Sequence, residues 1–198
     1  MARFLMTLVC AGVLFAARPA SAHPHIWIDV VASYLFDKDK VTGIRLQWTF
    51  DEFFSAGVID EFDKNKNNKF DDDEIAALKD GAFDGVKEGD FYTFLYIGDE
   101  RFKFEDVDDF SGKIEKGTVV YTFTVKFPTP VDPRKTPIGL SVYDESYFID
   151  LGFAKDDPIR VVGTDRKECA AEIFEDRANP IYYGMVFPKK AELRCGAK

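Results

Sequence analysis

The chain has 198 residues, enough for one domain with a substantial core, and it carries a net charge of −9. An acidic surface repels nucleic acid and anionic lipid, so we expect neither as a partner. The 20 phenylalanines and 8 tyrosines are expected to fill the core rather than to form a ligand-binding site.

Residues 1–22 have the pattern of a secretory signal peptide. A basic start precedes an apolar run at residues 4–17, and residues 20–22 form the small-x-small motif after which signal peptidase cleaves. A membrane anchor needs about 20 apolar residues, and Arg18 interrupts this run too early. Cleavage after Ala22 leaves an exported, soluble chain with 24 basic and 35 acidic residues, a net charge of −11, and no membrane insertion after processing.

His23 and His25 are the only histidines of the chain, and cleavage makes them residues one and three. The α-amine and the imidazole of His23 can chelate one metal ion together, and in an extended strand His25 points to the same side. Three nitrogen donors suit nickel, cobalt, zinc or copper, with an open position for a carboxylate such as Asp29 or Asp144. The alternative is that the two histidines only mark an exposed N-terminus.

Most of the remaining sequence predicts strands. Residues 46–50 and 119–127 alternate between apolar and polar side chains, which is typical of strands with one buried face. Seven or so short strands predict a mainly β fold, with the architecture of an immunoglobulin-like β-sandwich. The other β-like runs, separated by turn-forming residues, lie at 25–36, 91–97, 138–143, 147–153 and 159–162.

Residues 51–89 interrupt this β pattern. Apolar residues recur at helical spacing on both sides of an acidic loop, from Phe53 to Phe62 and again from Ile75 to Val86. We therefore expect an EF-hand-like helix–loop–helix inserted into a single domain that spans residues 23–198.

The loop at 63–74 fits the twelve-residue calcium-binding loop of an EF-hand. Asn68 stands where glycine usually allows a sharp turn, and Asn is the residue that best tolerates the left-handed conformation after glycine. Phe70 is expected to point into the core. The predicted ligands are Asp63, Asn65, Asn67, the Lys69 carbonyl, Asp71 and Glu74.

Only three of these ligands are charged, which predicts a weak site with a Kd on the order of 10⁻⁴–10⁻³ M. No second loop is present to pair with the first, so a structural role is favoured over a sensor. The alternative is a solvated acidic turn in which Asp71 or Asp72 caps the second helix.

Cysteine spacing indicates one disulfide. Cys10 leaves with the signal peptide, and Cys169 and Cys195 remain as a pair in an oxidising compartment. A thioredoxin-like redox role is not expected, because the chain has no C-x-x-C motif.

Four segments resemble a bacterial periplasmic family called domain of unknown function one thousand and seven. They are residues 23–29, residues 48–55, the calcium-like loop and residues 143–149. That family is often encoded beside NicO-type nickel/cobalt permeases, or is described as a periplasmic component of an uncharacterised transport system. The resemblance implies periplasmic metal handling and offers no catalytic residues to carry over.

These observations predict a periplasmic metal-binding accessory protein that exchanges a transition metal with an inner-membrane permease and has a structural calcium site. Two alternatives remain. One is a copper oxidase with a histidine brace, although such braces usually use a second histidine far along the chain, so an enzyme is not expected. The other is a calcium-stabilised structural or adhesion module without a transition metal.

Overall fold

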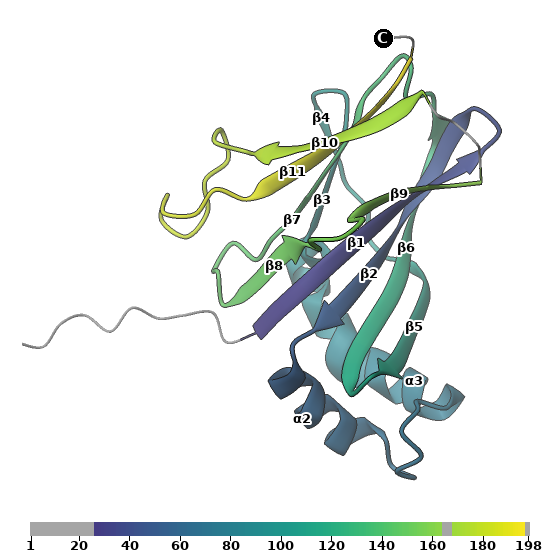
Figure 1. The fold of residues 1–198 in the computed structure, drawn as a ribbon, viewed down its shortest axis with the longest axis vertical. Coiled ribbons are helices and arrows are strands. Elements are labelled where there is room, and N and C mark those ends of the chain that lie inside the picture. The colour runs from purple at the N-terminus through teal and green to yellow at the C-terminus, as the bar shows by residue number, and fades with distance from the viewer. Residues whose placement is uncertain (1–25, 164–167, 197–198) are drawn as a thin grey trace, which may run out of the picture.

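Two β-sheets make up most of the fold. The computed structural model of the chain describes residues 26–163 and 168–196, whose strands form one six-stranded and one five-stranded sheet. Figure 1 shows the sheets with a helical segment at one end of the molecule. The expectation of a mainly β fold is therefore confirmed.

The six-stranded sheet has the order β5-β6-β2-β1-β8, and β9 also pairs with β1. β1 and β2 form an antiparallel hairpin, whereas β8 and β9 both pair with β1 in parallel. The strands are β1 (Ile26–Asp37), β2 (Lys40–Phe50), β5 (Asp108–Glu115), β6 (Thr118–Val131), β8 (Ile149–Phe153) and β9 (Ile159–Val162).

The five-stranded sheet has the order β10-β11-β7-β3-β4 and is antiparallel throughout. Cys169 and Cys195 lie opposite each other in the β10–β11 pair and form a disulfide, as predicted. The strands are β3 (Thr93–Ile97), β4 (Glu100–Phe102), β7 (Ile138–Val142), β10 (Cys169–Glu175) and β11 (Lys189–Cys195).

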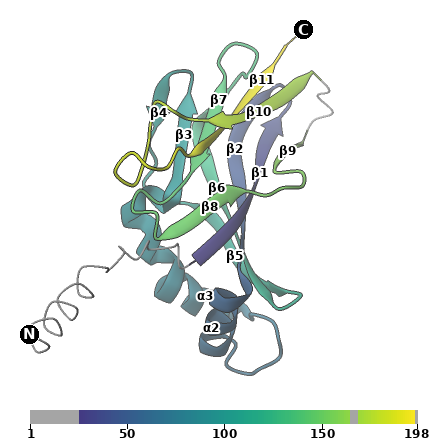
Figure 2. The same ribbon diagram turned by 60° about the vertical axis from the view of Figure 1, so that its left-hand side comes forward.

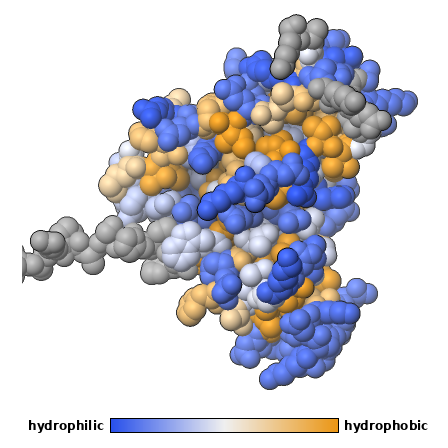
Figure 3. Space-filling view, in the orientation of Figure 1, coloured by the Kyte–Doolittle hydropathy of each residue, from blue (hydrophilic) through white to orange (hydrophobic). Residues whose placement is uncertain are grey.

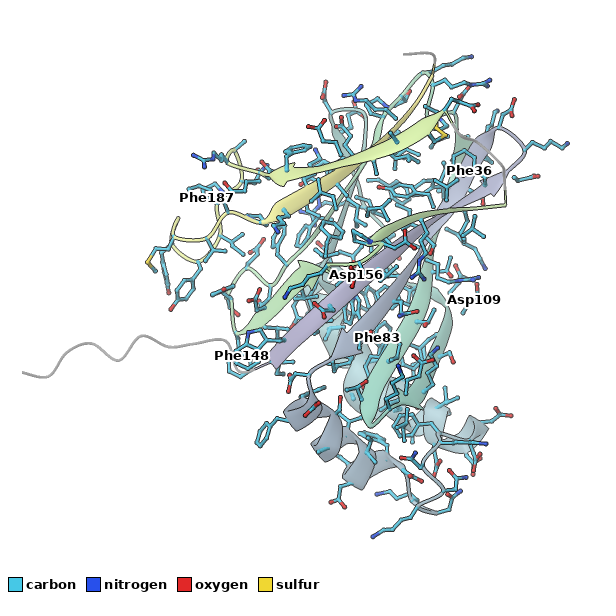
Figure 4. The ribbon with its side chains drawn as sticks, in the orientation of Figure 1. Phe36, Phe83, Asp109, Phe148, Asp156 and Phe187 are labelled. Carbon is cyan, nitrogen blue, oxygen red and sulfur yellow. A yellow bond between two sulfur atoms is a disulfide. The ribbon has the colours of Figure 1, made fainter. Side chains whose placement is uncertain are left out.

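One hydrophobic cluster joins the two sheets and the helical segment. Trp48 of β2 and Phe123 of β6 belong to the buried faces that the alternating patterns predict, and their rings meet edge to face at 4.9 Å between centroids. Phe83, labelled in Figure 4, lies at 6.2 Å from the Trp48 ring and 5.1 Å from the Phe123 ring. This aromatic group fixes the helical segment against the six-stranded sheet.

The helical segment follows β2 directly and lies at the same end of the molecule in both ribbon views (Figures 1 and 2). The expected helical insert at 51–89 is present, but its second half changes helix type twice. Gly81, Gly85 and Gly89 lie in this half, and glycine weakens a regular α-helix. The elements are α2 (Glu52–Phe62), α3 (Asp72–Leu78), a π-helix (Lys79–Phe83) and a 3-10 helix (Asp84–Tyr92).

Two sequence expectations need correction. β4, β5, β10 and β11 raise the number of strands above the seven or so predicted. β5 begins with Asp108 and Asp109, which are typical of turns, and its register with β6 is irregular between Asp108 and Ser111, where Asp109 has a positive φ of 54°. Phe91 and Tyr92, expected in a strand, instead end the 3-10 helix in the left-handed conformation.

None of the helices within residues 26–163 and 168–196 has both the length and the apolar character that a membrane-spanning helix requires.

The disulfide between β10 and β11 predicts a measurable loss of stability on its removal. Replacing Cys169 and Cys195 together by alanine is expected to lower the free energy of unfolding by roughly 2–4 kcal/mol, because the cross-link restricts the unfolded chain. Urea unfolding measures the loss. Thiol labelling of the processed wild type under denaturing, non-reducing conditions is the control, and two labelled thiols in that sample would contradict the assignment.

Candidate metal sites

The predicted calcium loop, residues 63–74, connects the end of α2 to the start of α3. Asp63 closes α2, because its N–H donates to the Ile59 carbonyl at 3.0 Å. Asp71 is the N-cap residue of α3, and its N–H donates to Glu74 Oε2 at 3.0 Å. Both ends of the loop are therefore fixed by residues that the sequence identified as ligands.

Asp63, the first predicted ligand, is turned into the loop. Its side chain is almost fully buried, and its two oxygens accept hydrogen bonds from Asn67 N–H (3.1 Å) and Asn68 N–H (2.9 Å). The chain thus winds around the Asp63 carboxylate.

Glu74, the last predicted ligand, reaches back from α3 to the beginning of the loop. It is also almost fully buried, and its Oε1 accepts a hydrogen bond from Lys64 N–H at 2.7 Å. A single carboxylate therefore holds together two backbone positions at opposite ends of the loop.

The three other side-chain ligands form a network between these carboxylates. The amide groups of Asn65 and Asn67 donate to Asp71 Oδ2 at 2.7 and 3.1 Å. The Asn65 side-chain oxygen accepts from Asn67 N–H (3.0 Å), and that of Asn67 accepts from Lys69 N–H (2.8 Å). All six predicted ligand residues thus belong to one compact loop.

The chemistry of this donor set fits a hard cation such as calcium, because every side chain supplies oxygen atoms. Asp63 and Glu74 are 5% and 8% exposed, and neither forms an ion pair with a residue that the structure describes. Buried negative charges without a basic partner are costly, and a bound cation would offset that cost.

The candidate calcium site in the loop at 63–74 does not consist of carboxylates alone. Across the described ranges 26–163 and 168–196, no group of three or more His, Cys, Asp or Glu side chains is arranged to hold a metal ion. The loop would instead combine three carboxylates with two amide oxygens and the Lys69 carbonyl, which is a weaker set of donors.

Asn68 has the left-handed backbone conformation that its position requires, with φ of 62°. Asn is the non-glycine residue best suited to this conformation, so the loop retains its turn without glycine. Phe70 is 7% exposed and belongs to the hydrophobic cluster, in agreement with its predicted orientation.

The predicted signal peptide, His23 and His25 lie outside the described residues. The chain is described from Ile26, which begins β1. Ile28 faces the core, whereas Trp27 and Asp29 are exposed on the other face of the strand.

The two carboxylates considered as further metal ligands differ in their availability. Asp144 is 8% exposed, and its oxygens accept hydrogen bonds from Ser146 Oγ–H (2.7 Å) and from the N–H groups of Phe148 and Ile149 (both 3.1 Å). Asp144 therefore shapes the turn that leads into β8. Asp29 is exposed, so of these two carboxylates it is the one accessible to a ligand.

Comparison with known proteins places the chain in a family. A model of the family described as a protein of unknown function (DUF1007) matches residues 8–185. The chain belongs to the DUF1007 family. The family predicted from the sequence motifs is therefore confirmed.

Two relatives of this DUF1007 protein are described as uncharacterized. A 15.5 kDa protein from the trpE 3' region of Spirochaeta aurantia is 31% identical over 134 residues, which cover 68% of this chain and 95% of that protein. A protein of Haemophilus influenzae is 22% identical over 164 residues, which cover 82% of this chain and 77% of that protein. Neither description names a ligand or an activity.

Two carboxylates lie beside the start of β1 in the DUF1007 protein, and the sequence analysis assigned neither of them to a site. Trp27 N–H donates to Asp51 Oδ2 at 3.0 Å, and Asp150 of β8 lies opposite Trp27 in the parallel β1–β8 pair. Asp51 precedes a helical pattern, so its role as an N-cap residue could have been predicted from the sequence. The position of Asp150 beside Trp27 could not, because parallel pairing between distant strands leaves no local sequence pattern.

The backbone of Asn68 generates a prediction about the loop without metal. Asn68→Gly is expected to leave the free energy of unfolding unchanged or to raise it by up to about 1 kcal/mol. Asn68→Val is expected to lower the free energy of unfolding by about 1–2 kcal/mol. Lys69→Val, at a neighbouring position without positive φ, is the matched control. Urea unfolding in the presence of a chelator measures all three, and equal losses for the two valine variants would contradict the prediction.

Proposed function

We propose that this DUF1007 protein is a periplasmic metal-binding accessory protein for transition-metal transport, and that it has a structural calcium site. The observation that carries metal binding is the loop at 63–74, where oxygen-bearing side chains gather around two buried carboxylates without a basic partner. The proposed site for the transported metal is the processed N-terminus, with the only two histidines of the chain.

In the proposed calcium site, the cation supplies the positive charge that the loop lacks. Asp63 and Glu74 would hold it from the ends of α2 and α3, with Asn65, Asn67, Asp71 and the Lys69 carbonyl as the remaining donors. Binding would join the two helices, so its role would be structural. The helical segment would then be an EF-hand-like insert on an immunoglobulin-like sandwich, which the two sheets with a shared core support.

The proposed transition-metal site begins next to the described structure. His25 directly precedes Ile26, the first residue of β1. Trp27 and Asp29 lie on the exposed face of that strand. We propose Asp29, an exposed carboxylate near this end of the chain, as the fourth donor.

Nickel, cobalt, zinc and copper all suit such a nitrogen-rich site, and the metal would be cargo rather than a resident cofactor. The partner would be an inner-membrane metal permease. The resemblance to the family implies a NicO-type nickel/cobalt permease as one such partner.

Two alternatives make different predictions. A calcium-stabilised module would keep the loop and bind no transition metal at its N-terminus. A copper oxidase with a histidine brace is less favoured, because His23 and His25 are the only histidines available to build it.

Calcium binding is expected to raise the melting temperature of the wild type. The stabilisation follows RT ln(1 + [Ca²⁺]/Kd), about 2.7 kcal/mol at one hundred times Kd. Glu74→Gln should lose most of this gain, because it removes a charge and one ligand oxygen. The matched control is Glu88→Gln, at an exposed position outside the loop.

Differential scanning calorimetry with and without calcium gives the gain for each protein. The increase in melting temperature on adding calcium is compared between the proteins. The absolute melting temperatures are not compared, because Glu74 also caps α3, and its replacement lowers stability without calcium as well. An unchanged wild-type melting temperature at about 100 mM calcium, one hundred times the upper end of the predicted Kd range, would refute the site.

Transition-metal binding is expected to depend on correct processing. Chain that begins at His23 should bind nickel, cobalt, zinc or copper more tightly than the same chain with one extra residue before His23, because the extension moves the free amine out of reach. Affinity should fall as pH drops through the unperturbed histidine pKa of about 6.5, since protons compete for the nitrogens. His25→Ala should also weaken binding.

Isothermal titration calorimetry measures these affinities. Equal affinity of the native and extended N-termini would exclude the amine as a ligand. Absence of binding to both, with calcium binding retained, would favour the calcium-stabilised module.

A further inference from the structure

An apolar groove of about 590 Å³ lies between α2 and the π-helix residues Gly81 and Ala82. Figure 3 shows hydrophobic surface in this lower part of the molecule, bordered by hydrophilic residues. Figure 4 places Phe148 at the start of β1, on the side where α2 begins. The groove is lined chiefly by Ile26, Phe53, Phe54, Gly57, Phe62 and Phe148.

The groove extends along about two turns of α2. Phe53, Gly57 and Glu61 line it at intervals of four residues, so they follow one face of α2 over roughly 12 Å. A side chain built on Gly57 meets no atom within 4 Å, which leaves the middle of the groove open. Phe53 is 89% exposed, so the groove presents a large aromatic surface to solvent.

A deeper cavity of about 60 Å³ adjoins the groove, and both are lined by Ile26, Phe54 and Ala82. Trp48 and Tyr121 line the cavity. Their polar atoms, Trp48 Nε1 and Tyr121 Oη, are buried without a hydrogen-bond partner in the described part of the chain. The cavity could receive one anchoring side chain from a molecule bound in the groove.

The helix that borders the groove is acidic. Glu61 lines the groove itself, and α2 also carries Glu52 and Asp60 and no basic residue. None of the three forms an ion pair with a described residue. Three lysines follow α2 in the loop at 63–74, but the same loop carries five acids, so this end of the molecule remains acidic. Lys79, near Gly81 and Ala82 of the other wall, is paired with Asp84.

We propose that this groove binds a basic amphipathic helix of a partner protein, with its apolar side chains in the groove and its Lys or Arg residues against the α2 acids. An anionic lipid surface would be repelled by the same acids. A symmetric dimer through this face would bring the acids of two copies together, which is unfavourable. The inference rests on the groove and its charges, and it does not depend on either proposed metal site.

The test uses mature chain beginning at His23 and a labelled synthetic peptide of leucine and lysine, with the leucines at helical spacing. Fluorescence anisotropy is expected to show binding of this peptide. A scrambled peptide of the same composition should bind at least tenfold more weakly, because it cannot place its leucines on one face. A glutamate-for-lysine version should not bind.

Two matched variants locate the binding site. Gly57→Leu fills the groove without a steric clash and should weaken peptide binding at least tenfold while the protein stays folded. Gly85→Leu, where an added side chain also meets open space but outside the groove, should leave binding unchanged. Glu61→Lys should weaken binding through the rim charge.

Equal affinity of wild type and Gly57→Leu for the peptide would overturn the proposal, since it would show attraction to net charge alone. Equal binding of the ordered and scrambled peptides would do the same. A concentration-dependent dimer in sedimentation velocity that Gly57→Leu abolishes would also overturn it, because a second copy would then be the occupant.

Discussion

Asp51 holds three parts of the chain in one arrangement. Its Oδ1 accepts hydrogen bonds from Phe53 N–H and Phe54 N–H (both 2.9 Å), which caps the first turn of α2. Its Oδ2 accepts from Trp27 N–H, and Asp51 N–H donates to the Trp27 carbonyl (both 3.0 Å). An N-cap alone contributes about 1 kcal/mol. Here the same residue also sets the direction in which α2 leaves the six-stranded sheet, next to the start of β1.

The candidate functional features all depend on that arrangement. The end of α2 places Asp63 at the beginning of the loop, its outer side forms the groove, and β1 begins where the processed N-terminus would emerge. Ser55 gives a second attachment, because its buried Oγ accepts a hydrogen bond from Val119 N–H of β6 at 2.9 Å. The inner side of α2 is thus held by the Ser55 hydrogen bond and by the packing of Val58 and Phe62 in the core, which leaves Phe53 and Gly57 exposed to another molecule.

Local patterns predicted the parts of this structure that depend on local chemistry. The alternation around Trp48 and Phe123 identified buried strand faces, the order of oxygen-bearing residues identified the loop, and the cysteine pair identified the disulfide. Parallel pairing of β8 and β9 with β1 left no such pattern, so Asp150 was missed. The role of Asp144 was also hidden, since its burial and its hydrogen bonds to a turn appear only in three dimensions.

A crystal structure of the mature chain, grown with millimolar calcium and nickel and examined by anomalous scattering, tests the central claim most directly. The proposal requires a calcium ion bounded by Asp63, Asn65, Asn67, Asp71 and Glu74. It also requires a transition-metal peak at the imidazoles of His23 and His25, from nickel or, in parallel crystals, from cobalt, zinc or copper. A loop without calcium and an N-terminus without any of these metals would contradict it.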